Sequence, residues 1–304
     1  MGVDTSSFVL DCRGLPLDCR PVPFGPAQVV GILNVTPDSF SDGGEYTDLD
    51  AALKRTEEMI AEGAAVVDVG GASSRPAGTA YGEGAEAVEA TEERERVIPV
   101  ISGIRARFPE VIISVDTYQP EVARAALDAG ANIINDITAL RFHPEMAAIA
   151  AEAGAPLILM HSLGQPGAMP HEHTYKDVVG EVTGVLRDAV GVARGAGVQQ
   201  LVLDPGFGFG KRTEENLRLM ARVDAFTELG YPVMIGVSRK SSIGAVLGDP
   251  GPPVPIHDRL FGSLGTTAVA VLRGASLVRT HDVGPTVDML STLAATARAG
   301  RDST

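Results

Sequence analysis

The chain has 304 residues, of which 44% are hydrophobic, so it can build a substantial core in one large or two small domains, and a disordered chain is excluded. Its 25 basic and 39 acidic residues give a formal net charge of −14, a field that repels nucleic acids and anionic membrane surfaces. No apolar run reaches the roughly 18 to 20 residues of a membrane-spanning helix and residues 1–26 lack a signal-peptide pattern, so we expect a cytoplasmic protein with small-molecule partners.

A short repeat opens the chain. Leu10-Asp11-Cys12-Arg13 recurs as Leu17-Asp18-Cys19-Arg20 on the other side of Gly14-Leu15-Pro16. This pattern predicts a small hairpin, which we expect to lie across the floor of the domain that follows. We therefore divide the chain into an extension, residues 1–26, and a barrel domain, residues 27–304.

Short β-branched runs alternate with longer Ala-, Glu- and Leu-rich stretches from residue 27 onward. Such alternation predicts βαβ units with a parallel sheet. The near-continuously apolar runs are typical of strands covered on both faces. The predicted strands are Val29–Asn34, Ala65–Val69, Val111–Asp116, Asn132–Asp136, Pro156–His161, Gln200–Asp204, Pro232–Val237 and Ser276–Thr280.

A helical pattern follows each predicted strand. The predicted helices are Leu49–Glu62, Thr91–Arg107, Glu121–Asp128, Pro144–Ala153, Tyr175–Arg194, Glu214–Leu229, a split stretch over Arg239–Arg273, and Pro285–Arg298. Eight such pairs match the size of a (β/α)8 TIM barrel. A doubly wound open sheet is the structural alternative.

Polar residues stand at the carboxyl end of every predicted strand, which is where the active site of such a barrel lies. They are Asn34, Asp68, Asp116, Asn135-Asp136, His161, Asp204, Ser238-Arg239-Lys240 and Arg279-Thr280-His281-Asp282. Any one of them could cap the next helix, but caps alone do not explain all eight.

These side chains fall into two chemical groups. A carboxylate accepts two parallel N–H bonds and an Asn amide both donates and accepts, so acids and amides suit the edge of an amino-pyrimidinone ring. The group that suits this flat heterocycle is Asp116, Asn135, Asp204 and Lys240. The group that suits phosphate or a metal–phosphate complex is Asn34, Arg75, Arg279 and His281.

The motifs in which these residues lie resemble those of one enzyme family. Gly31–Gly44, GILNVTPDSFSDGG, is similar to the first signature of the dihydropteroate synthases, and Asp68–Pro76, DVGGASSRP, resembles the second. The other motifs follow in the family's order: Ser114–Thr117, Asn135-Asp136, Met160-His161, Asp204–Phe209, Ser238–Lys240 and Arg279–Asp282. The resemblance extends from Ala27 to Arg298.

The resemblance implies a transferase of folate biosynthesis, a sulfonamide target that acts as a homodimer with Mg²⁺. The reaction condenses 7,8-dihydropterin-6-ylmethyl diphosphate with 4-aminobenzoate, giving 7,8-dihydropteroate and diphosphate. Carbon–oxygen cleavage leaves positive charge on a methylene conjugated with the pterin ring, which a carboxylate such as Asp116 stabilises. The departing diphosphate needs neutralisation, which Mg²⁺, a guanidinium and a protonated or N–H-donating imidazole supply.

The resemblance also implies a role for each matching residue. The pterin-binding positions are Asp116, Asn135, Asp204 and Lys240. The diphosphate positions are Asn34, Arg75, Arg279 and His281, with Asn34 also the Mg²⁺ ligand. The 4-aminobenzoate positions are Phe40, Ser74, Arg75 and Pro76. The catalytic positions are Asp116, Lys240, Arg279 and His281.

Two residues depart from the family pattern. Ala72 stands where a Glu is usual, and Ala77 separates Pro76 from Gly78. Both lie in Ala72–Ala90, a long irregular segment that we interpret as a flexible lid. They bear on the 4-aminobenzoate site rather than on the pterin pocket.

Other signals have simpler interpretations. Gly206–Lys211 lacks the spacing of a nucleotide loop, and we interpret its glycines as allowing close approach of the backbone to the pterin. His171 and His173 fit a solvated loop better than a metal site. His161 either lines the pocket or is a core histidine. The run Glu92–Arg96 is interpreted as a solvated helix face.

Two alternatives to the synthase remain open. A pterin-dependent methyltransferase barrel would need a similar heterocycle pocket, but not a diphosphate site, and Arg279 and His281 therefore favour the synthase. A non-catalytic pterin-binding barrel would have no reason to keep both groups of residues. The apolar stretch Leu264–Leu272 is consistent with a homodimer, although a barrel helix can bury such a face internally.

Overall fold

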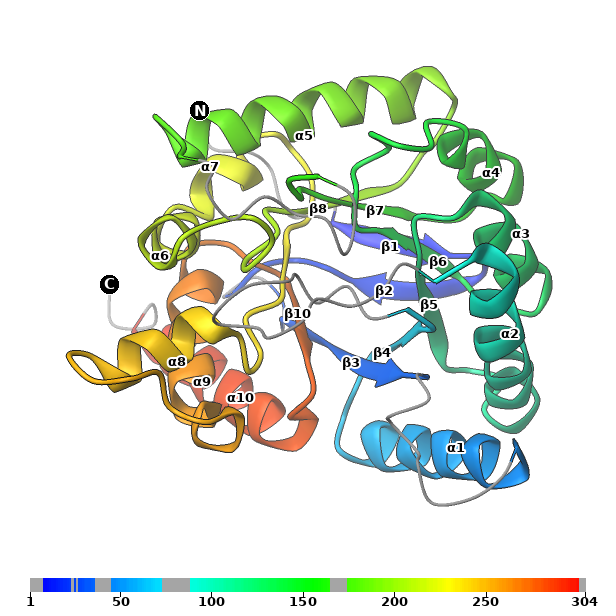
Figure 1. Cartoon of the computed structure of the whole chain (residues 1–304), viewed down its shortest axis with the longest axis horizontal. Helices are drawn as coiled ribbons and strands as arrows, with labels where there is room; N and C mark the ends of the chain where they lie inside the picture. Colours follow the sequence, from blue (N-terminus) through cyan, green and yellow to red (C-terminus); the bar gives the residue numbers. More distant parts are fainter. Residues whose placement is uncertain are drawn as a thin grey trace.

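Eight parallel strands form a nearly closed barrel (Figure 1). The computed structural model describes residues 8–22, 25, 27–35, 45–72, 88–164 and 174–300, and for residues 45–48 it describes the backbone alone. The strands are β3 (Gln28–Asn34), β4 (Val66–Gly70), β5 (Ile112–Asp116), β6 (Ile133–Asp136), β7 (Leu157–Met160), β8 (Leu201–Asp204), β9 (Met234–Ile235) and β10 (Leu277–Thr280). They pair in the order β8-β7-β6-β5-β4-β3-β10-β9, and a single parallel bridge between Leu203 and Val233 joins the two ends. The predicted barrel is confirmed.

Helices cover the outside of the barrel. They are α1 (Glu45–Ala61), α2 (Ala90–Arg107), α3 (Pro120–Asp128), α4 (Met146–Ala153), α5 (Val178–Gly195), α6 (Thr213–Ala221), α7 (Asp224–Thr227), α8 (Ser241–Gly248), the 3-10 helix η2 (Ile256–Asp258), α9 (Leu260–Leu272) and α10 (Val283–Ala299). The prediction of one helix over Glu214–Leu229 is wrong, because the backbone leaves helical geometry at Arg222 (φ −126°, ψ 35°) between α6 and α7.

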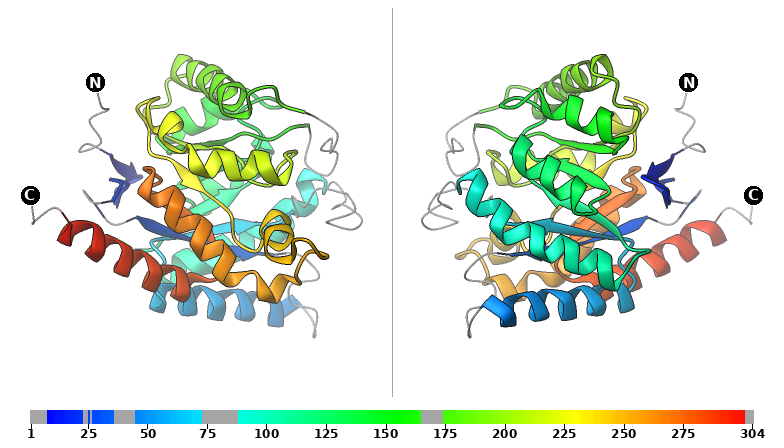
Figure 2. Two further views of the ribbon diagram at one scale, coloured as in Figure 1. Left: turned by 90° about the vertical axis from the view of Figure 1, so that its left-hand side faces the viewer. Right: turned by 90° about the vertical axis from the view of Figure 1, so that its right-hand side faces the viewer.

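A two-stranded hairpin precedes the barrel. β1 (Val9–Cys12) and β2 (Leu15–Asp18) pair antiparallel around Arg13 and Gly14, whose φ angles of 56° and 94° are those of a type I′ turn. Figure 2 shows the hairpin across one end of the barrel. Arg13 Nη1 donates to the carbonyl of Leu127 at 2.8 Å, which ties the turn to the barrel.

The barrel interior is layered. Because alternate side chains of a strand face the same side, the first inward residue of each strand meets the hairpin at the floor. This apolar layer packs Leu10, Cys12 and Leu17 against Val30, Val66, Ile112, Ile133, Ile158, Val202, Met234 and Leu277. The next inward residues include Asp68, Ser114, Asn135, Asp204 and Arg279, so a polar layer lies directly above the floor.

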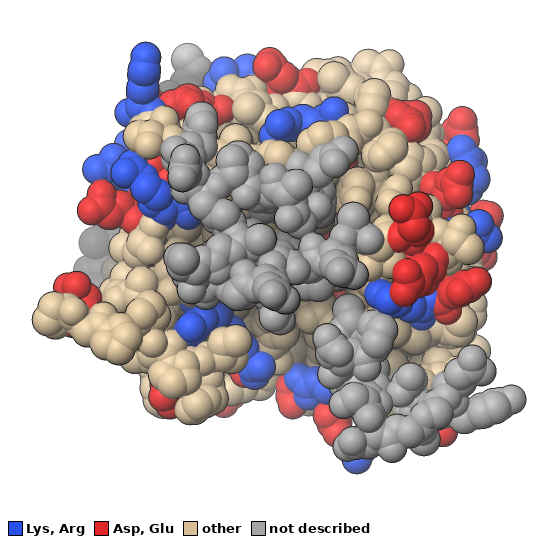
Figure 3. All heavy atoms as spheres, in the orientation of Figure 1, with Lys and Arg blue, Asp and Glu red and all other residues tan. Residues whose placement is uncertain are grey.

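The surface of the described part carries both signs of charge. On the face shown in Figure 3, acidic and basic side chains are interspersed. Within the described ranges, no helix combines the length and the hydropathy that crossing a membrane would require. The division of the chain at residues 26 and 27 stays a prediction.

Candidate active site

Strand pairing brings three predicted positions into one row, with Gly70 between two of them. Asn34 on β3 pairs with Gly70 on β4, Gly70 pairs with Asp116 on β5, and Asp116 pairs with Asn135 on β6. Residues in register on neighbouring strands point to the same side, so the three polar side chains share the inside of the barrel. Gly70 adds no side chain to the row, which leaves room between Asn34 and Asp116.

Arg279 reaches across the barrel interior from β10. Its Nε donates to Asp68 Oδ2 at 2.6 Å and its Nη2 donates to Asp116 Oδ2 at 2.7 Å. The same Asp68 oxygen accepts from Asn135 Nδ2 at 3.2 Å. A guanidinium, an amide and two carboxylates thus form one network between strands that are far apart in sequence.

Asn135 and its neighbour Asp136 have different hydrogen-bonding roles. Asp136 is buried and accepts from the backbone N–H groups of Thr138 and Leu140 at 2.8 and 2.7 Å. It also accepts from the Thr138 hydroxyl at 2.7 Å. Asp136 therefore holds the turn after β6, and only Asn135 belongs to the interior network.

The loop after β8 is built around Asp204. Asp204 Oδ1 accepts from the backbone N–H of Gly206 at 2.7 Å. Gly206 has φ +69°, and a Cβ there would lie 1.8 Å from the carbonyl oxygen of His161, so glycine is required at this close approach. Lys211 Nζ closes the loop by donating to the carbonyls of Gly206 and Phe209 at 2.7 and 3.1 Å.

Lys240 enters the interior from the start of α8. Its Nζ lies 3.9 Å from the centroid of the Phe209 ring. A Cβ at Gly208 would lie 3.0 Å from Lys240 Cδ, so the missing side chain there lets the lysine lie on the loop. Lys240 is thereby held close to the loop that Asp204 and Lys211 support.

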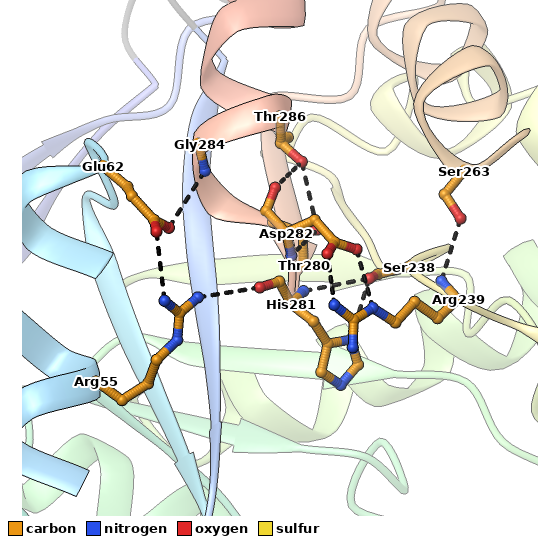
Figure 4. Close-up of polar contacts among 10 residues, drawn as sticks. All are labelled: Arg55, Glu62, Ser238, Arg239, Ser263, Thr280, His281, Asp282, Gly284 and Thr286. Atoms are coloured by element: carbon orange, nitrogen blue, oxygen red, sulfur yellow. Dashed lines mark hydrogen bonds and ion pairs between the residues drawn. The ribbon is translucent and has the colours of Figure 1, made fainter. Parts of the chain in front are cut away.

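His281 is fixed from two sides (Figure 4). Its ring Nδ1 lies 3.0 Å from Ser238 Oγ, and that hydroxyl also accepts from the His281 backbone N–H at 3.2 Å. The His281 carbonyl accepts from Arg55 Nη2 at 3.2 Å. Since a hydroxyl that accepts the backbone N–H can donate to Nδ1, this contact favours the imidazole form with its proton on Nε2.

Burial shifts the titration of the acidic groups. It raises the pKa of Asp116 to about 7. The positive charge of Arg279 opposes this rise, and the negative charge of Asp68 adds to it. Burial also raises the pKa of Asp204 to about 6, although the Gly206 N–H favours the carboxylate. Both carboxyl groups therefore lose their protons closer to neutral pH than an ordinary aspartate does.

Burial has the opposite effect on the basic groups. It lowers the pKa of Lys240 to about 8, and repulsion by Arg279 adds to the shift. It lowers the pKa of His281 to about 3, with Arg279 and Arg239 contributing, so the imidazole is neutral at neutral pH. Burial opposes the charged form of Arg279 too, but the carboxylates of Asp68 and Asp116 outweigh it and raise the Arg279 pKa.

A cavity of about 450 Å³ lies beside His281, between α1 and α10. Its walls are Ile32, Arg55, Glu62, Arg239, His281, Asp282, Val283 and Pro285. Its guanidinium groups are already paired: Arg55 with Glu62 at 3.3 Å, and Arg239 Nε with Asp282 Oδ2 at 3.0 Å. Both guanidinium groups of this cavity therefore already have carboxylate partners, as Arg279 has inside the barrel.

The structure places the predicted residues Asn135, Asp204 and Arg279 in the polar layer, with Asp116 beside them at the end of β5. Arg279 bonds directly to Asp116, and Asp68 links Arg279 to Asn135. Lys240 contacts the Phe209 ring in the loop after β8, and Asp204 supports the start of the same loop. Asn34 stands exposed at the end of β3. Phe40, Ser74, Arg75, Pro76, Ala77, His171 and His173 lie outside the described residues, and so does most of the predicted lid. Their roles stay predictions.

Three residues of the site had no role assigned from the sequence. They are Asp68, Phe209 and Lys211. A carboxylate between valines in a buried strand was a usable signal for Asp68, since such a group needs a partner. Nothing local reveals that the Phe209 ring meets Lys240, because that contact joins two separate loops.

The interpretation of Glu92–Arg96 as a solvated face is wrong for Glu93. Glu93 is 1% exposed and packs beside Gly71, while Glu92, Arg94 and Glu95 are exposed. Burial raises the Glu93 pKa to about 7, although a hydrogen bond with Thr117 opposes the shift. His161 is also buried, with its ring 6.3 Å from that of Tyr175, which fits the core interpretation of this residue.

Comparisons with known proteins agree with this chemistry. The family described as pterin binding enzyme matches residues 30–281. Dihydropteroate synthase of Escherichia coli K12 is 45% identical over 274 residues, which cover 90% of this chain and 92% of that protein. Xanthomonas albilineans dihydropteroate synthase with 4-aminobenzoic acid has a TM-score of 0.83 at 44% identity, over 95% of this chain and 97% of the other. Yersinia pestis dihydropteroate synthase with a sulfonamide drug has a TM-score of 0.83 at 40% identity, over 95% and 99%.

Proposed function

The chain belongs to the dihydropteroate synthases, a family of pterin-binding enzymes, and from this we propose which of its residues carry the reaction. The enzyme condenses 7,8-dihydropterin-6-ylmethyl diphosphate with 4-aminobenzoate and releases diphosphate, a step of folate biosynthesis that sulfonamides target. The observation that carries the assignment is the Arg279 network, because it joins the carboxylate and amide group to the anion-binding group inside the barrel.

Asp116, Asn135, Asp204 and Lys240 bind the pterin in this proposal. The ring edge of a pterin offers N–H donors and a carbonyl acceptor in one plane, which carboxylates, an amide and an ammonium can pair. Asp116 then faces the positive charge that develops on the methylene when the carbon–oxygen bond breaks. Its carboxylate form is the useful one, since only a negative charge stabilises that cation.

Arg279 and His281 receive the diphosphate. The guanidinium neutralises developing negative charge, and the neutral His281 donates its Nε2 proton as a hydrogen bond. Ser238 contributes by holding the imidazole through Nδ1. No covalent bond between enzyme and substrate is required for the transfer.

Mg²⁺ fits the donor set around Asn34. Mg²⁺ takes oxygen ligands, and it usually keeps several waters and binds substrate phosphates. Asn34 supplies an exposed amide oxygen at the barrel mouth, and the described residues contain no cluster of three acidic, His or Cys side chains that would form an all-protein metal cage. Bound there, the ion would add charge neutralisation at the departing diphosphate.

The 4-aminobenzoate site is proposed at Phe40, Ser74, Arg75 and Pro76, which follow β3 and β4 in the sequence. The support is the match of these positions to the family signatures. The amine of 4-aminobenzoate attacks the methylene, forms the carbon–nitrogen bond and loses one proton, while diphosphate leaves with the electron pair of the broken carbon–oxygen bond.

A direct assay tests the function. The purified chain receives the pterin diphosphate, 4-aminobenzoate and Mg²⁺, and dihydropteroate and diphosphate are measured together. Equal amounts of both products are expected. Release of diphosphate without dihydropteroate would contradict the synthase assignment, and so would binding of the pterin without turnover.

We also propose a homodimer formed through α8, η2 and α9. These adjacent elements expose a group of apolar side chains, of which Phe261 is 82% exposed, and such a patch is unfavourable in water. The group comprises Val246, Leu247, Ile256, Phe261, Val269 and Leu272. Light scattering should give twice the mass of 31.6 kDa for the wild type and a lower mass for Phe261→Ser, with Val9→Ser on the hairpin as control.

A cytoplasmic location is the remaining proposal. Its support is chemical: Cys12 and Cys19 are buried free thiols, which are typical of a reducing compartment. Fractionation of cells that express the chain, with antibody detection, tests it.

A further inference from the structure

Asp68 is the most deeply placed polar residue of the interior network. It is fully buried in the middle of β4, below Gly70, and it pairs in register with Ser114 on β5. Its Oδ2 accepts from Arg279 Nε at 2.6 Å and from Asn135 Nδ2 at 3.2 Å. One oxygen therefore joins a residue of the diphosphate group to a residue of the pterin group.

The other oxygen of Asp68 argues against a purely stabilising role. Oδ1 is buried and has no hydrogen-bond partner among the described residues. An unsatisfied buried carboxylate oxygen costs stability, and buried ion pairs can often be replaced by apolar residues without loss. Val66, the preceding inward residue of β4, is a buried valine, so this side of the strand already holds an apolar side chain.

We propose that Asp68 is a positioning residue, which holds the guanidinium of Arg279 and the amide of Asn135 so that the diphosphate and pterin halves of the site are set by one anchor. This inference rests on the proposed function. Asp68 need not touch substrate, because it acts through the two side chains that it holds.

The anchor matters because Arg279 has two partners. An incoming pterin needs the carboxylate of Asp116, whose Oδ2 is bonded to Arg279 Nη2. Since Asp68 binds the separate Nε atom, the bond to Asp116 can be given up while the guanidinium stays inside the barrel. The remaining N–H groups of the guanidinium then meet the diphosphate that arrives with the pterin.

A double-mutant cycle on ligand binding tests this role. Calorimetry measures inorganic diphosphate with Mg²⁺, and separately 6-hydroxymethylpterin, binding to wild type, Asp68→Asn, Arg279→Ala and the double variant. Compared with the wild type, Asp68→Asn should bind diphosphate about 10-fold or more weakly. Compared with Arg279→Ala, the double variant should bind it less than about twofold more weakly, because the two residues act as a unit. Equal losses in both backgrounds overturn the proposal.

Asp136→Asn is the matched control. Asp136 is also a buried carboxylate of a barrel strand, but it holds only the turn at Thr138 and Leu140. It should lower thermal stability and leave diphosphate affinity within about twofold of the wild type. A loss of diphosphate affinity as large as that of Asp68→Asn would mean that damage to any buried carboxylate of the barrel strands has the same effect, which also overturns the proposal.

If Asp68→Asn does not fold, the variant Arg279→Lys tests the same contact. Arg279→Lys keeps the positive charge but cannot span Asp68 and Asp116 as a planar fork does. Its diphosphate affinity should fall close to that of Arg279→Ala, and wild-type affinity in Arg279→Lys would overturn the anchor. Failure of the wild type to bind either probe would instead count against the proposed function.

Discussion

Lys240 rests on the face of the Phe209 ring, with its ammonium nitrogen 3.9 Å from the ring centroid. The two residues come from the loops after β9 and β8, so this contact joins neighbouring walls of the barrel. An aromatic face attracts a cation, and the Phe209 side chain is largely buried, at 7% exposed. The ring therefore holds the lysine in the interior while leaving its N–H groups available to a ligand.

Lys240→Ala and Asp204→Asn should each weaken binding of a non-reactive pterin. Each change leaves a buried polar group of the pocket or the ligand without its partner, which costs roughly 1–3 kcal/mol. Calorimetry measures the affinity, and Lys176→Ala, at an exposed position, is the control. Unchanged affinity in both site variants would remove these residues from the pterin pocket.

His281→Ala should act on diphosphate rather than on the pterin. His281 lies directly after β10, and its imidazole is held by Ser238, which follows β9. The carboxylates that suit the pterin ring lie on other strands, β5 and β8. We expect a lower turnover rate and weaker binding of Mg²⁺-diphosphate, with affinity for 6-hydroxymethylpterin nearly unchanged. His257→Ala, at an exposed histidine, should match the wild type in both titrations. A loss of pterin binding equal to that in Asp204→Asn would refute the division of the site.

Gly206→Ala should be far more harmful than Gly154→Ala. Both glycines have positive φ, at 69° and 63°, so both substitutions carry the backbone cost of about 1–2 kcal/mol. Only at Gly206 would the added Cβ meet a backbone atom, the His161 carbonyl at 1.8 Å, whereas the space around Gly154 is open. Denaturant unfolding should show a further ~1–3 kcal/mol lost for Gly206→Ala. Equal free energies of unfolding would mean that the loop adjusts freely.

Glu93→Gln should stabilise the protein more as the pH rises. Burial raises the Glu93 pKa from 4.5 to about 7, so the folded state binds more protons than the unfolded state within this window. The contribution of Glu93 to the free energy of unfolding therefore falls as the pH rises from about 4.5 to about 7. Glutamine does not ionise, and the difference from the wild type should grow by on the order of 2 to 3 kcal/mol between pH 4.5 and 8.

Urea unfolding of Glu93→Gln and wild type at a series of pH values measures this difference. Glu95→Gln, on the exposed side of the same helix, is the control and should run parallel to the wild type. A constant difference between Glu93→Gln and wild type across the series would show that Glu93 does not hold its proton through folding.

The order of strands and helices could be predicted from the sequence because it depends on local pattern. Buried parallel strands need continuous apolar runs and helices need a one-sided pattern, so Ile112–Asp116 and Ala90–Arg107 were predicted within one residue at each end. The hairpin around Arg13 and Gly14 was also predicted from the repeat and its glycine turn.

The chemistry of the strand ends was equally visible in the sequence. In a barrel every strand delivers its carboxyl end to the same face, so residues as distant as Asp116 and Arg279 could be expected together before their positions were known. The motif resemblance then gave these residues their family roles.

The tertiary structure alone decided which of these polar residues contact one another. Asp68 and Asp136 are both buried aspartates of barrel strands, yet one anchors Arg279 and Asn135 while the other holds a turn. Their difference depends on which side of the strand each residue faces and on barrel closure, which places β10 beside β3. Burial of Glu93 has the same origin, because only the packing of α2 on β4 takes that carboxylate out of water. Contacts and pKa shifts of this kind depend on distances between segments remote in sequence, and no local pattern encodes those distances.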